Sequence, residues 1–202
     1  MAMQQLVIAS NNSGKIEEIR SMVDNIELLS MKDIGFTEEI EEPFHSFEEN
    51  ALTKAKTIVA FSGKNAFADD SGLCVPALNN EPGVHSAYYG GLPRTDEKNN
   101  ARLLKELENR TDRTAFYKCV ICLIWEADTY FFEGICEGSI ALQPTGEKGF
   151  GYDPLFIPAG YDESFGVLPL SVKNELSHRG KAVRKMVDFL SKTDNNEIFD
   201  RR

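Results

Sequence analysis

In residues 6–45, short runs of apolar residues are followed by a segment whose apolar residues are spaced as on one face of a helix. Residues 6–9 form an apolar run that is typical of a buried strand. Residues 15–23 instead place apolar side chains on one helix face, namely Ile16, Ile19, Met22 and Val23. Residues 27–30 predict a further short strand. The acidic segment 37–45 contains Pro43 and predicts a loop or the edge of a strand.

Residues 46–62 form the clearest helical pattern. Ser46 is suited to cap the N-terminus, with Glu49 as its partner in a capping box. Asn50 and Lys54 are four residues apart and therefore share a face of this helix. The core-facing stripe consists of Phe47, Ala51, Ala55, Ile58 and Val59.

The middle of the chain predicts further strands. Residues 65–68 predict a strand that ends at the sequence Asp69-Asp-Ser-Gly72. Residues 114–125 and 129–136 are long and rich in β-forming residues, which predicts a hairpin joined by residues 126–128. Residues 146–158 are rich in glycine, aromatic residues and proline and predict an ordered loop.

Two more helices complete the pattern. Residues 95–107 predict an amphipathic helix with Thr95 as its cap. Ser177 begins a last helix, and the polar tail after Lys192 predicts a frayed end. The inner face of that helix would be Ala182, Val183, Met186, Phe189 and Leu190. Without a repeat or a linker, the pattern predicts one α/β domain with a mixed sheet over residues 1–202.

Composition narrows the possible functions. The 202 residues carry 22 basic and 32 acidic side chains, a net charge of −10, which makes general nucleic-acid binding an unfavourable interpretation. No apolar run is long enough to cross a bilayer, and residues 1–9 lack the pattern of a signal peptide. We therefore expect a cytoplasmic protein with no membrane partner. Its four cysteines, including the pair Cys119 and Cys122, are expected to be reduced, buried thiols rather than a zinc site.

The loop Ser10-Asn-Asn-Ser-Gly-Lys15 joins a predicted strand to a predicted helix. Such a junction gathers free N–H groups and the positive end of the helix dipole, and Lys15 adds a full charge. A phosphate cradle and an ordinary strand–helix turn are equally good interpretations. It is not a Walker A loop, because Ile16 follows the lysine where Ser or Thr is needed.

The adjacent carboxylates of Asp69 and Asp70 repel each other and favour a cation or solvent. Oxygen ligands of this kind suit Mg²⁺, whereas the alternative is a surface turn. Glu41 and Glu42 form a second acidic pair, which on composition alone is better explained as a solvated charge run.

The segment Gly149-Phe-Gly-Tyr-Asp-Pro-Leu-Phe156 could stack aromatic rings on a base, or it could be a packed turn. Lys173 and the sequence Ser177-His-Arg-Gly-Lys181 put cations near a helix start, which an anionic ligand would explain. The alternative is a capped helix with solvated cations. The chain has only three histidines and no Gly-x-Ser-x-Gly elbow, so a Ser-His-Asp triad is disfavoured.

Together these segments resemble the inosine triphosphate pyrophosphatase family, the dITP/XTP diphosphatases, over residues 6–185. The matching segments are Ser10-Asn-Asn-Ser-Gly-Lys15, Ser46-Phe-Glu-Glu-Asn-Ala51 with Lys54-Ala55, Asp69-Asp-Ser-Gly-Leu73, Pro82-Gly-Val-His-Ser-Ala87, Gly149-Phe-Gly-Tyr-Asp-Pro154 and Ser177-His-Arg-Gly-Lys-Ala182. Each segment alone is only a weak sign of this family, but their order and spacing over one chain make the combination specific for it.

The resemblance implies an elongated mixed β-sheet flanked by helices, with two lobes around a central cleft, and a homodimer. It implies hydrolysis of ITP, dITP and XTP to the monophosphate and pyrophosphate. The implied cofactor is Mg²⁺, one ion per subunit, with Mn²⁺ as a substitute.

The resemblance also implies roles for single residues. Asp70 would be the catalytic carboxylate and a metal ligand, with Glu41 as first choice and Glu42 as second choice for the other ligand. Ser71 would contact substrate, and Lys54 would assist Lys15 in stabilising phosphate charge. The phosphates would be held by Ser10, Asn11, Asn12, Ser13, Gly14 and Lys15. The base and the rest of the nucleotide would be held by Phe150, Gly151, Tyr152, Asp153, Lys173, His178 and Arg179.

The chain departs from the family pattern in three places. Tyr88 stands where an arginine is frequent, Asn80 where a glycine is frequent, and Glu147-Lys148 resembles an insertion. Three other functions also fit parts of the pattern: a pyrophosphatase of the Maf type acting on pyrimidine or modified nucleotides, a nucleotide sensor without turnover, and a structural module.

Overall fold

The computed structural model describes residues 4–23 and 26–200, with only the helical backbone for residues 194–200. Within these residues, seven strands form one sheet in the order β2-β1-β3-β5-β6-β7, with β4 paired to β3. Their bounds are Gln4–Ile8 (β1), Ile26–Ser30 (β2), Ala66–Val75 (β3), Glu81–Pro82 (β4), Thr114–Trp125 (β5), Asp128–Ile140 (β6) and Phe156–Pro158 (β7). The predicted α/β fold with a mixed sheet is confirmed.

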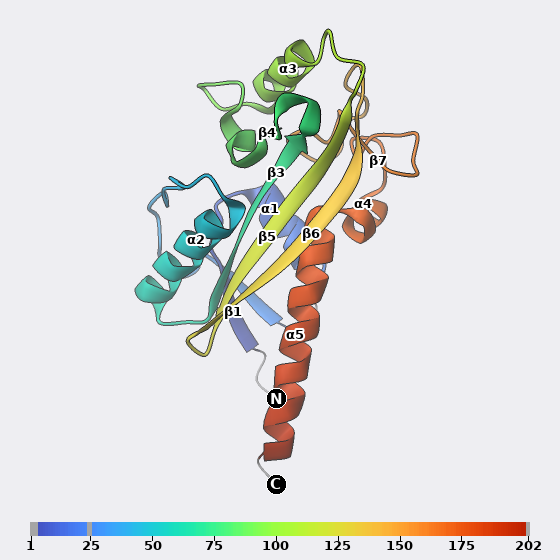
Figure 1. Cartoon of the computed structure of the whole chain (residues 1–202). Coiled ribbons are helices and arrows are strands. Elements are labelled where there is room, and N and C mark those ends of the chain that lie inside the picture. Colours follow the sequence, from blue (N-terminus) through green and yellow to red (C-terminus); the bar gives the residue numbers. More distant parts are fainter. Residues whose placement is uncertain (1–3, 24–25, 201–202) are drawn as a thin grey trace.

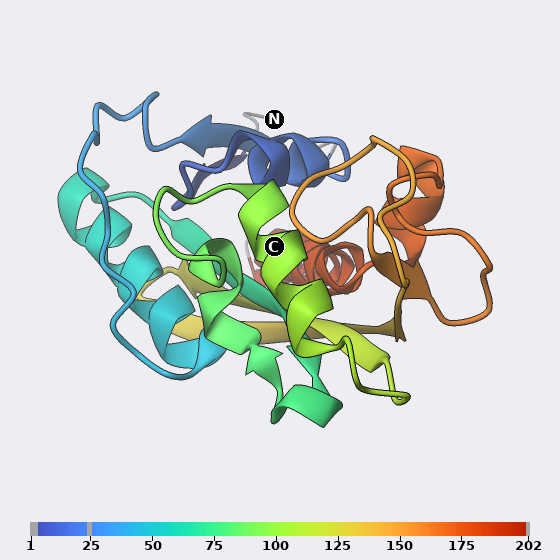
Figure 2. The same ribbon diagram turned by 90° about the horizontal axis from the view of Figure 1, so that it is seen from above.

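Helices cover both faces of this sheet (Figure 1). In the described part of the chain, α2 lies on one face and α5 on the other, while α3 crosses the upper part of the molecule (Figure 2). The helices are Ser13–Arg20 (α1), Phe47–Ser62 (α2), Asp96–Glu106 (α3), Leu170–Leu176 (α4) and His178–Asp200 (α5), with short 3₁₀ helices at Pro76–Leu78 and Gly83–Tyr88. None of these described helices is both long and apolar enough to span a membrane.

The predicted caps are present. The Ser46 side chain accepts a hydrogen bond from the Glu49 N–H, which confirms the cap. The Glu49 carboxylate accepts a hydrogen bond from the Ser46 hydroxyl at 2.6 Å, whereas a capping box uses the Ser46 N–H. Thr95 caps α3 in the same way through the Lys98 N–H. These caps fix where α2 and α3 begin, and both helices contribute side chains near the site described below.

Strand β3 differs from its prediction. The strand does not end before Asp69 but continues to Val75, because β5 pairs with it across the acidic residues. Asp69 lies opposite Ile121 and Asp70 opposite Val120 in this antiparallel ladder. Both the expected strand end and the alternative of a surface turn are therefore wrong. Since side chains alternate along a strand, the two carboxylates point to opposite faces of the sheet.

The predicted hairpin is confirmed and is longer than expected. Strands β5 and β6 pair without interruption from Thr114–Ser139 to Trp125–Asp128. Glu126 and Ala127, with φ values of 51° and 72°, form a two-residue turn, so Asp128 already belongs to the second strand. This long two-stranded ribbon runs through both the upper and the lower parts of the molecule (Figure 1).

Several boundaries were wrong. Helix α1 begins at Ser13 rather than at residue 15, β7 lies inside the predicted loop 146–158, α4 was not predicted, and α5 continues past Lys192. The short segments β7 and α4 carry too few residues to show a period, so packing rather than pattern determines them.

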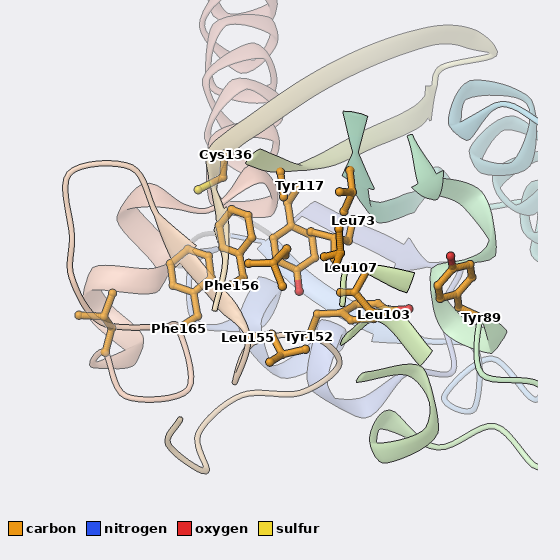
Figure 3. Packing of buried hydrophobic residues seen from close by; sticks show 14 residues of the cluster. Leu73, Tyr89, Leu103, Leu107, Tyr117, Cys136, Tyr152, Leu155, Phe156 and Phe165 are labelled. Atoms are coloured by element: carbon orange, nitrogen blue, oxygen red, sulfur yellow. The ribbon is translucent and has the colours of Figure 1, made fainter. Parts of the chain in front are cut away.

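Buried side chains form separate clusters above and below the site. The upper cluster packs Tyr117, Phe156 and Phe165 against Leu73 and Leu103 (Figure 3). The lower clusters lie on the two faces of the sheet, under α2 and under α5. The four cysteines are free and buried, as expected, and burial raises the pKa of the Cys119 thiol to about 12. A thiol in that state is a poor nucleophile and a poor metal ligand.

Candidate active site

A cavity of about 600 Å³ lies between the upper and lower parts of the molecule. Fifteen of the residues that the sequence singles out line it: Ser10, Asn11, Asn12, Lys15, Glu42, Lys54, Asp70, Ser71, Phe150, Gly151, Tyr152, Asp153, Lys173, His178 and Arg179. Ser13 and Gly14 line an adjacent cavity instead. Glu41 lines neither of the two cavities. Residues separated by up to 170 positions in the chain thus meet around one space.

Asp69 lies behind the cavity wall as a buried anchor. Its Oδ2 atom is 3.1 Å from Lys15 Nζ and 3.3 Å from Arg179 Nε. Burial raises the pKa of Asp69, but Lys15 and Arg179 outweigh burial and hold that pKa well below its usual range. Asp69 therefore stays ionised and fixes two cations that face the cavity.

Asp70, on the opposite face of β3, faces the cavity and has weaker compensation. Its carboxylate accepts hydrogen bonds from Asn50 Nδ2 and the Ser71 N–H, each at 3.1 Å, and lies 3.5 Å from Lys54 Nζ. Burial raises the pKa of Asp70, although Lys54 and Lys15 oppose the shift. A carboxylate with a raised pKa is a stronger base than an exposed one.

Lys54 connects Asp70 to the acidic segment that precedes α2. Its Nζ atom donates to Glu42 Oε1 at 2.9 Å, so Glu42 and Asp70 share one ammonium group. Glu41, the first choice for the second metal ligand, is not brought to the cavity. Glu42 was the second choice and stands beside Asp70.

These two carboxylates fit a hard divalent cation. Mg²⁺ is typically held by one or two carboxylates together with substrate phosphates and water. No cluster of three or more His, Cys, Asp or Glu side chains suited to a metal occurs among the described side chains of residues 4–23 and 26–193. A dedicated all-protein cage is therefore absent from those residues, and a pair of carboxylates facing a cavity is the arrangement that a substrate-bridging ion uses.

The segment 10–15 is partly helix rather than loop. Asn12 caps α1 by accepting the Lys15 N–H at 3.1 Å, so Lys15 projects from the first helical turn. Gly14 is needed for space and not for an unusual backbone angle: a Cβ atom there would lie 2.8 Å from the Phe150 ring. The start of α1 therefore lies against the aromatic loop that carries Phe150.

A buried ionic network forms the wall at the other end. Glu18 of α1 accepts hydrogen bonds from both Lys173 Nζ and Arg179 Nη1. Lys173 also donates to Asp153 Oδ2 at 2.6 Å. The anionic ligand expected to explain the cations near α5 is therefore not required, because the protein's own carboxylates neutralise them.

Aromatic rings and a neutral histidine complete this end of the cavity. Lys173 Nζ lies 4.8 Å from the centre of the Phe150 ring. The His178 ring stacks on Tyr117 at 4.5 Å and 6°, and its buried Nδ1 atom has no hydrogen-bond partner among the described residues. Burial lowers the pKa of His178, and Arg179 and Lys173 lower it further, so the ring is neutral. We call this region the Phe150 end and the opposite region the Asp70 end.

Sequence reasoning missed several residues of the site. Glu18 is buried beside Ile19 on α1, and its spacing of three from Lys15 was the available signal. Asp96 accepts the Gly151 N–H at 2.6 Å and so holds the aromatic loop. Tyr117 and Arg94 also line the cavity, but nothing in the pattern separates them from ordinary strand and loop residues.

Two departures from the family pattern have a local explanation. Asn80 has a φ of 64°, a left-handed conformation that asparagine tolerates better than most residues. Lys148 of the suspected insertion donates to the Val167 carbonyl at 2.7 Å, which fastens it to a neighbouring segment. Neither change reaches the Asp70 end.

The fold and the cavity define an α/β protein with a charged cavity between its upper and lower parts. The chain belongs to the Ham1 family, whose model matches residues 6–189. It is 47% identical over 190 residues to the dITP/XTP pyrophosphatase of Flavobacterium johnsoniae, covering 94% of this chain and 99% of that protein. The dITP/XTP pyrophosphatase of Nitrosomonas europaea is 42% identical over 197 residues, covering 95% and 97%. The structure of the Staphylococcus aureus Ham1 protein matches with a TM-score of 0.86 and 38% identity, covering 94% of this chain and all of that one.

Proposed function

We propose that this protein hydrolyses the non-standard purine nucleoside triphosphates ITP, dITP and XTP to the monophosphate and pyrophosphate. The observation that carries the proposal is the convergence of Asp70, Glu42 and Lys54 with the capped start of α1 around one cavity. The names of its relatives support the same activity. Removal of such nucleotides from the cellular pool is the role that follows.

In the proposed reaction, water attacks the α-phosphorus and pyrophosphate leaves. Asp70 orients this water and accepts its proton. Asn50 holds the carboxylate in place through a hydrogen bond of 3.1 Å. Lys15 and Lys54 stabilise the negative charge that develops on the phosphates.

Asp70 and Glu42 are the residues that would hold Mg²⁺, one ion per subunit, and Mn²⁺ has the same preference for oxygen. When bound, the ion neutralises part of the phosphate charge and aligns the phosphates for displacement. The exposed position of Glu42, whose side chain is 35% exposed, leaves space for water and phosphate oxygens beside it.

The Phe150 end is proposed to recognise the purine. Phe150 offers a stacking surface, and Lys173, Arg179 and the neutral His178 are polar groups held at fixed positions. A donor aimed at the 6-oxygen of hypoxanthine or xanthine would face the amino group of ATP, and such a mismatch costs a factor of about 10² or more in selectivity. Exclusion of GTP requires a further contact at the 2-position.

The test is hydrolysis of ITP, XTP, dITP, GTP and ATP with Mg²⁺, with separation of the products. We expect monophosphate and pyrophosphate from the first three and slow turnover of GTP and ATP. Preferred hydrolysis of a pyrimidine or modified nucleotide would favour the Maf-type alternative. Tight binding without product would favour a sensor, and equal rates on all five nucleotides would leave only a general triphosphatase.

We further propose that residues 1–202 act as a single two-lobed domain, as a homodimer and in the cytoplasm. The sheet that connects the upper and lower clusters supports the first point. Sedimentation equilibrium would test the dimer, which predicts a mass of twice 22.6 kDa.

A further inference from the structure

We propose that Arg94 binds the triphosphate of the substrate by exchanging its contact with Glu39 for one with a phosphate oxygen. This inference rests on the proposed function, since it names a further residue for the same ligand. It arises from a comparison of the five cations that line the cavity in the described part of the chain, namely Lys15, Lys54, Arg94, Lys173 and Arg179.

Four of the five cations are buried or nearly so and already paired. Lys173 and Arg179 each contact two carboxylates, and Lys54 lies between Glu42 and Asp70. Lys15 is 3.1 Å from the buried Asp69. These partners offset part of the charge on each of the four cations, so an incoming anion gains less from any one of them than from a weakly paired cation.

Arg94 differs in its partner. Its Nη1 atom has one carboxylate contact, with Glu39 Oε1 at 3.4 Å, and the Glu39 side chain is 79% exposed. An exposed ion pair of this length is weak and screened by salt. A phosphate oxygen can therefore replace Glu39 at low cost, and Arg94 is the lining cation whose charge is most available.

The Arg94 side chain and its loop are held in place before a ligand binds. Its guanidinium group lies over the Tyr88 ring, 5.2 Å from the ring centre. The intervening loop is braced on α3, because the Gly90 N–H donates to Asn99 Oδ1 at 2.6 Å and Lys98 Nζ donates to the Leu92 carbonyl at 3.1 Å. A guanidinium held on a ring and a braced loop loses less freedom on binding than a free side chain.

The contact with Glu39 connects Arg94 to the acidic segment of the Asp70 end. Glu39 lies three residues before Glu42, and Glu42 is held by Lys54 beside Asp70. Asp96, two residues after Arg94, holds the Gly151 N–H, so the segment that carries Arg94 contacts both ends of the cavity. The planar fork of arginine suits two phosphate oxygens at once.

A simpler alternative is that the Arg94–Glu39 pair only fastens two loops across the mouth of the cavity. The two interpretations predict opposite effects of removing Glu39. If the pair is a fastening, Glu39→Gln and Arg94→Gln weaken ligand binding alike. If Glu39 competes with the phosphate for Arg94, Glu39→Gln strengthens binding while Arg94→Gln weakens it.

The experiment measures binding of inorganic tripolyphosphate and of IMP, each with Mg²⁺, by titration calorimetry. We expect Arg94→Gln to weaken tripolyphosphate binding about fivefold, Glu39→Gln to strengthen it about twofold, and the double variant to resemble Arg94→Gln. IMP binding should stay within a factor of two in all three. Arg110→Gln is the matched control, because Arg110 is exposed and outside the cavity lining.

The proposal would be overturned if the unmodified protein does not bind tripolyphosphate or if Arg94→Gln leaves that binding unchanged. It would also be overturned if Glu39→Gln weakens tripolyphosphate binding as much as Arg94→Gln does, or if Arg94→Gln affects IMP binding more than tripolyphosphate binding. The proposed function is judged separately, by release of pyrophosphate from ITP by the unmodified protein. Binding that depends on Arg94 without such release would sustain this inference and reject the proposed function.

Discussion

The Asp70 end and the Phe150 end of the cavity balance their charges in different ways. At the Phe150 end, Lys173 and Arg179 are buried, and each contacts two carboxylates. At the Asp70 end, the buried Lys54 lies between Asp70 and the partly exposed Glu42, and the preceding segment contributes the exposed Glu39, which contacts Arg94. A compensated, buried network holds its geometry, whereas loosely paired charges exchange partners readily.

The difference matches the two halves of a nucleotide. A base is uncharged and is selected by shape and by fixed donors and acceptors. A triphosphate carries about four negative charges and needs cations that can turn toward it. The rigid end therefore suits selection of the base, and the open end suits binding and reaction of the phosphates.

The largest expected effect comes from removing the charge of Asp70. Asp70→Asn keeps the size of the side chain but removes the base, so turnover of ITP should fall about 10³-fold. Pyrophosphate release measures the loss, and thermal unfolding checks that the variant folds. Asp162→Asn, at an exposed position, is the control and should keep normal turnover. Near-normal turnover in Asp70→Asn would remove the assigned role.

Removing a cation from the buried ionic network of the Phe150 end should lower the free energy of unfolding. Lys173→Met removes the cation between Glu18 and Asp153 and leaves both carboxylates without it, which should lower the free energy of unfolding by about 3 kcal/mol. Urea unfolding measures the change. Lys192→Met, at an exposed position of α5, is the control and should change it by less than about 0.5 kcal/mol. A similar small loss for both variants would contradict the picture of a rigid end.

The pH dependence of stability should reveal Asp69. Its pKa in the folded protein lies below that of about 3.9 in the unfolded chain, so its ion pairs stabilise the fold above pH 4. This contribution is lost as the pH falls through the folded pKa. The free energy of unfolding of Asp69→Asn should therefore fall furthest below that of the unmodified protein at neutral pH, and this difference should shrink in strong acid. A deficit that is the same at pH 7 and pH 3 would argue against a permanently ionised Asp69.

A smaller effect is expected where the two ends touch. Gly14→Ala adds a Cβ atom 2.8 Å from the Phe150 ring, so the ring must move. Alanine also favours the helix by about 1 kcal/mol, which offsets the strain. We expect KM for ITP to rise several-fold with little change in unfolding temperature. An unchanged KM would mean that the position of Phe150 does not matter for binding.

Much of the fold was readable from the sequence because long segments show a clear period. The hairpin β5–β6 and the helix α2 with its Ser46 cap are examples. Strand β3 was misjudged because Asp69 and Asp70 are unfavourable in a buried strand unless cations from distant segments meet them. Those cations, Lys15 and Lys54, come from α1 and α2, and no local sequence pattern predicts that they meet at β3.

The site was predicted unevenly for the same reason. Residues in distinctive motifs, such as Lys15 and Asp70, were identified, and the structure brings them together. Glu18 was missed because an acidic residue on a helix next to an apolar face normally points to solvent. Glu42 could not be separated from Glu41, since only the position of Lys54 decides which of the two faces the cavity.

The central claim is that water attacks the α-phosphorus beside Asp70. Hydrolysis of ITP with Mg²⁺ in ¹⁸O-labelled water tests it most directly, with mass spectrometry of both products. The account predicts one ¹⁸O atom in IMP and none in pyrophosphate. Label in pyrophosphate, or release of labelled orthophosphate with IDP, would contradict it.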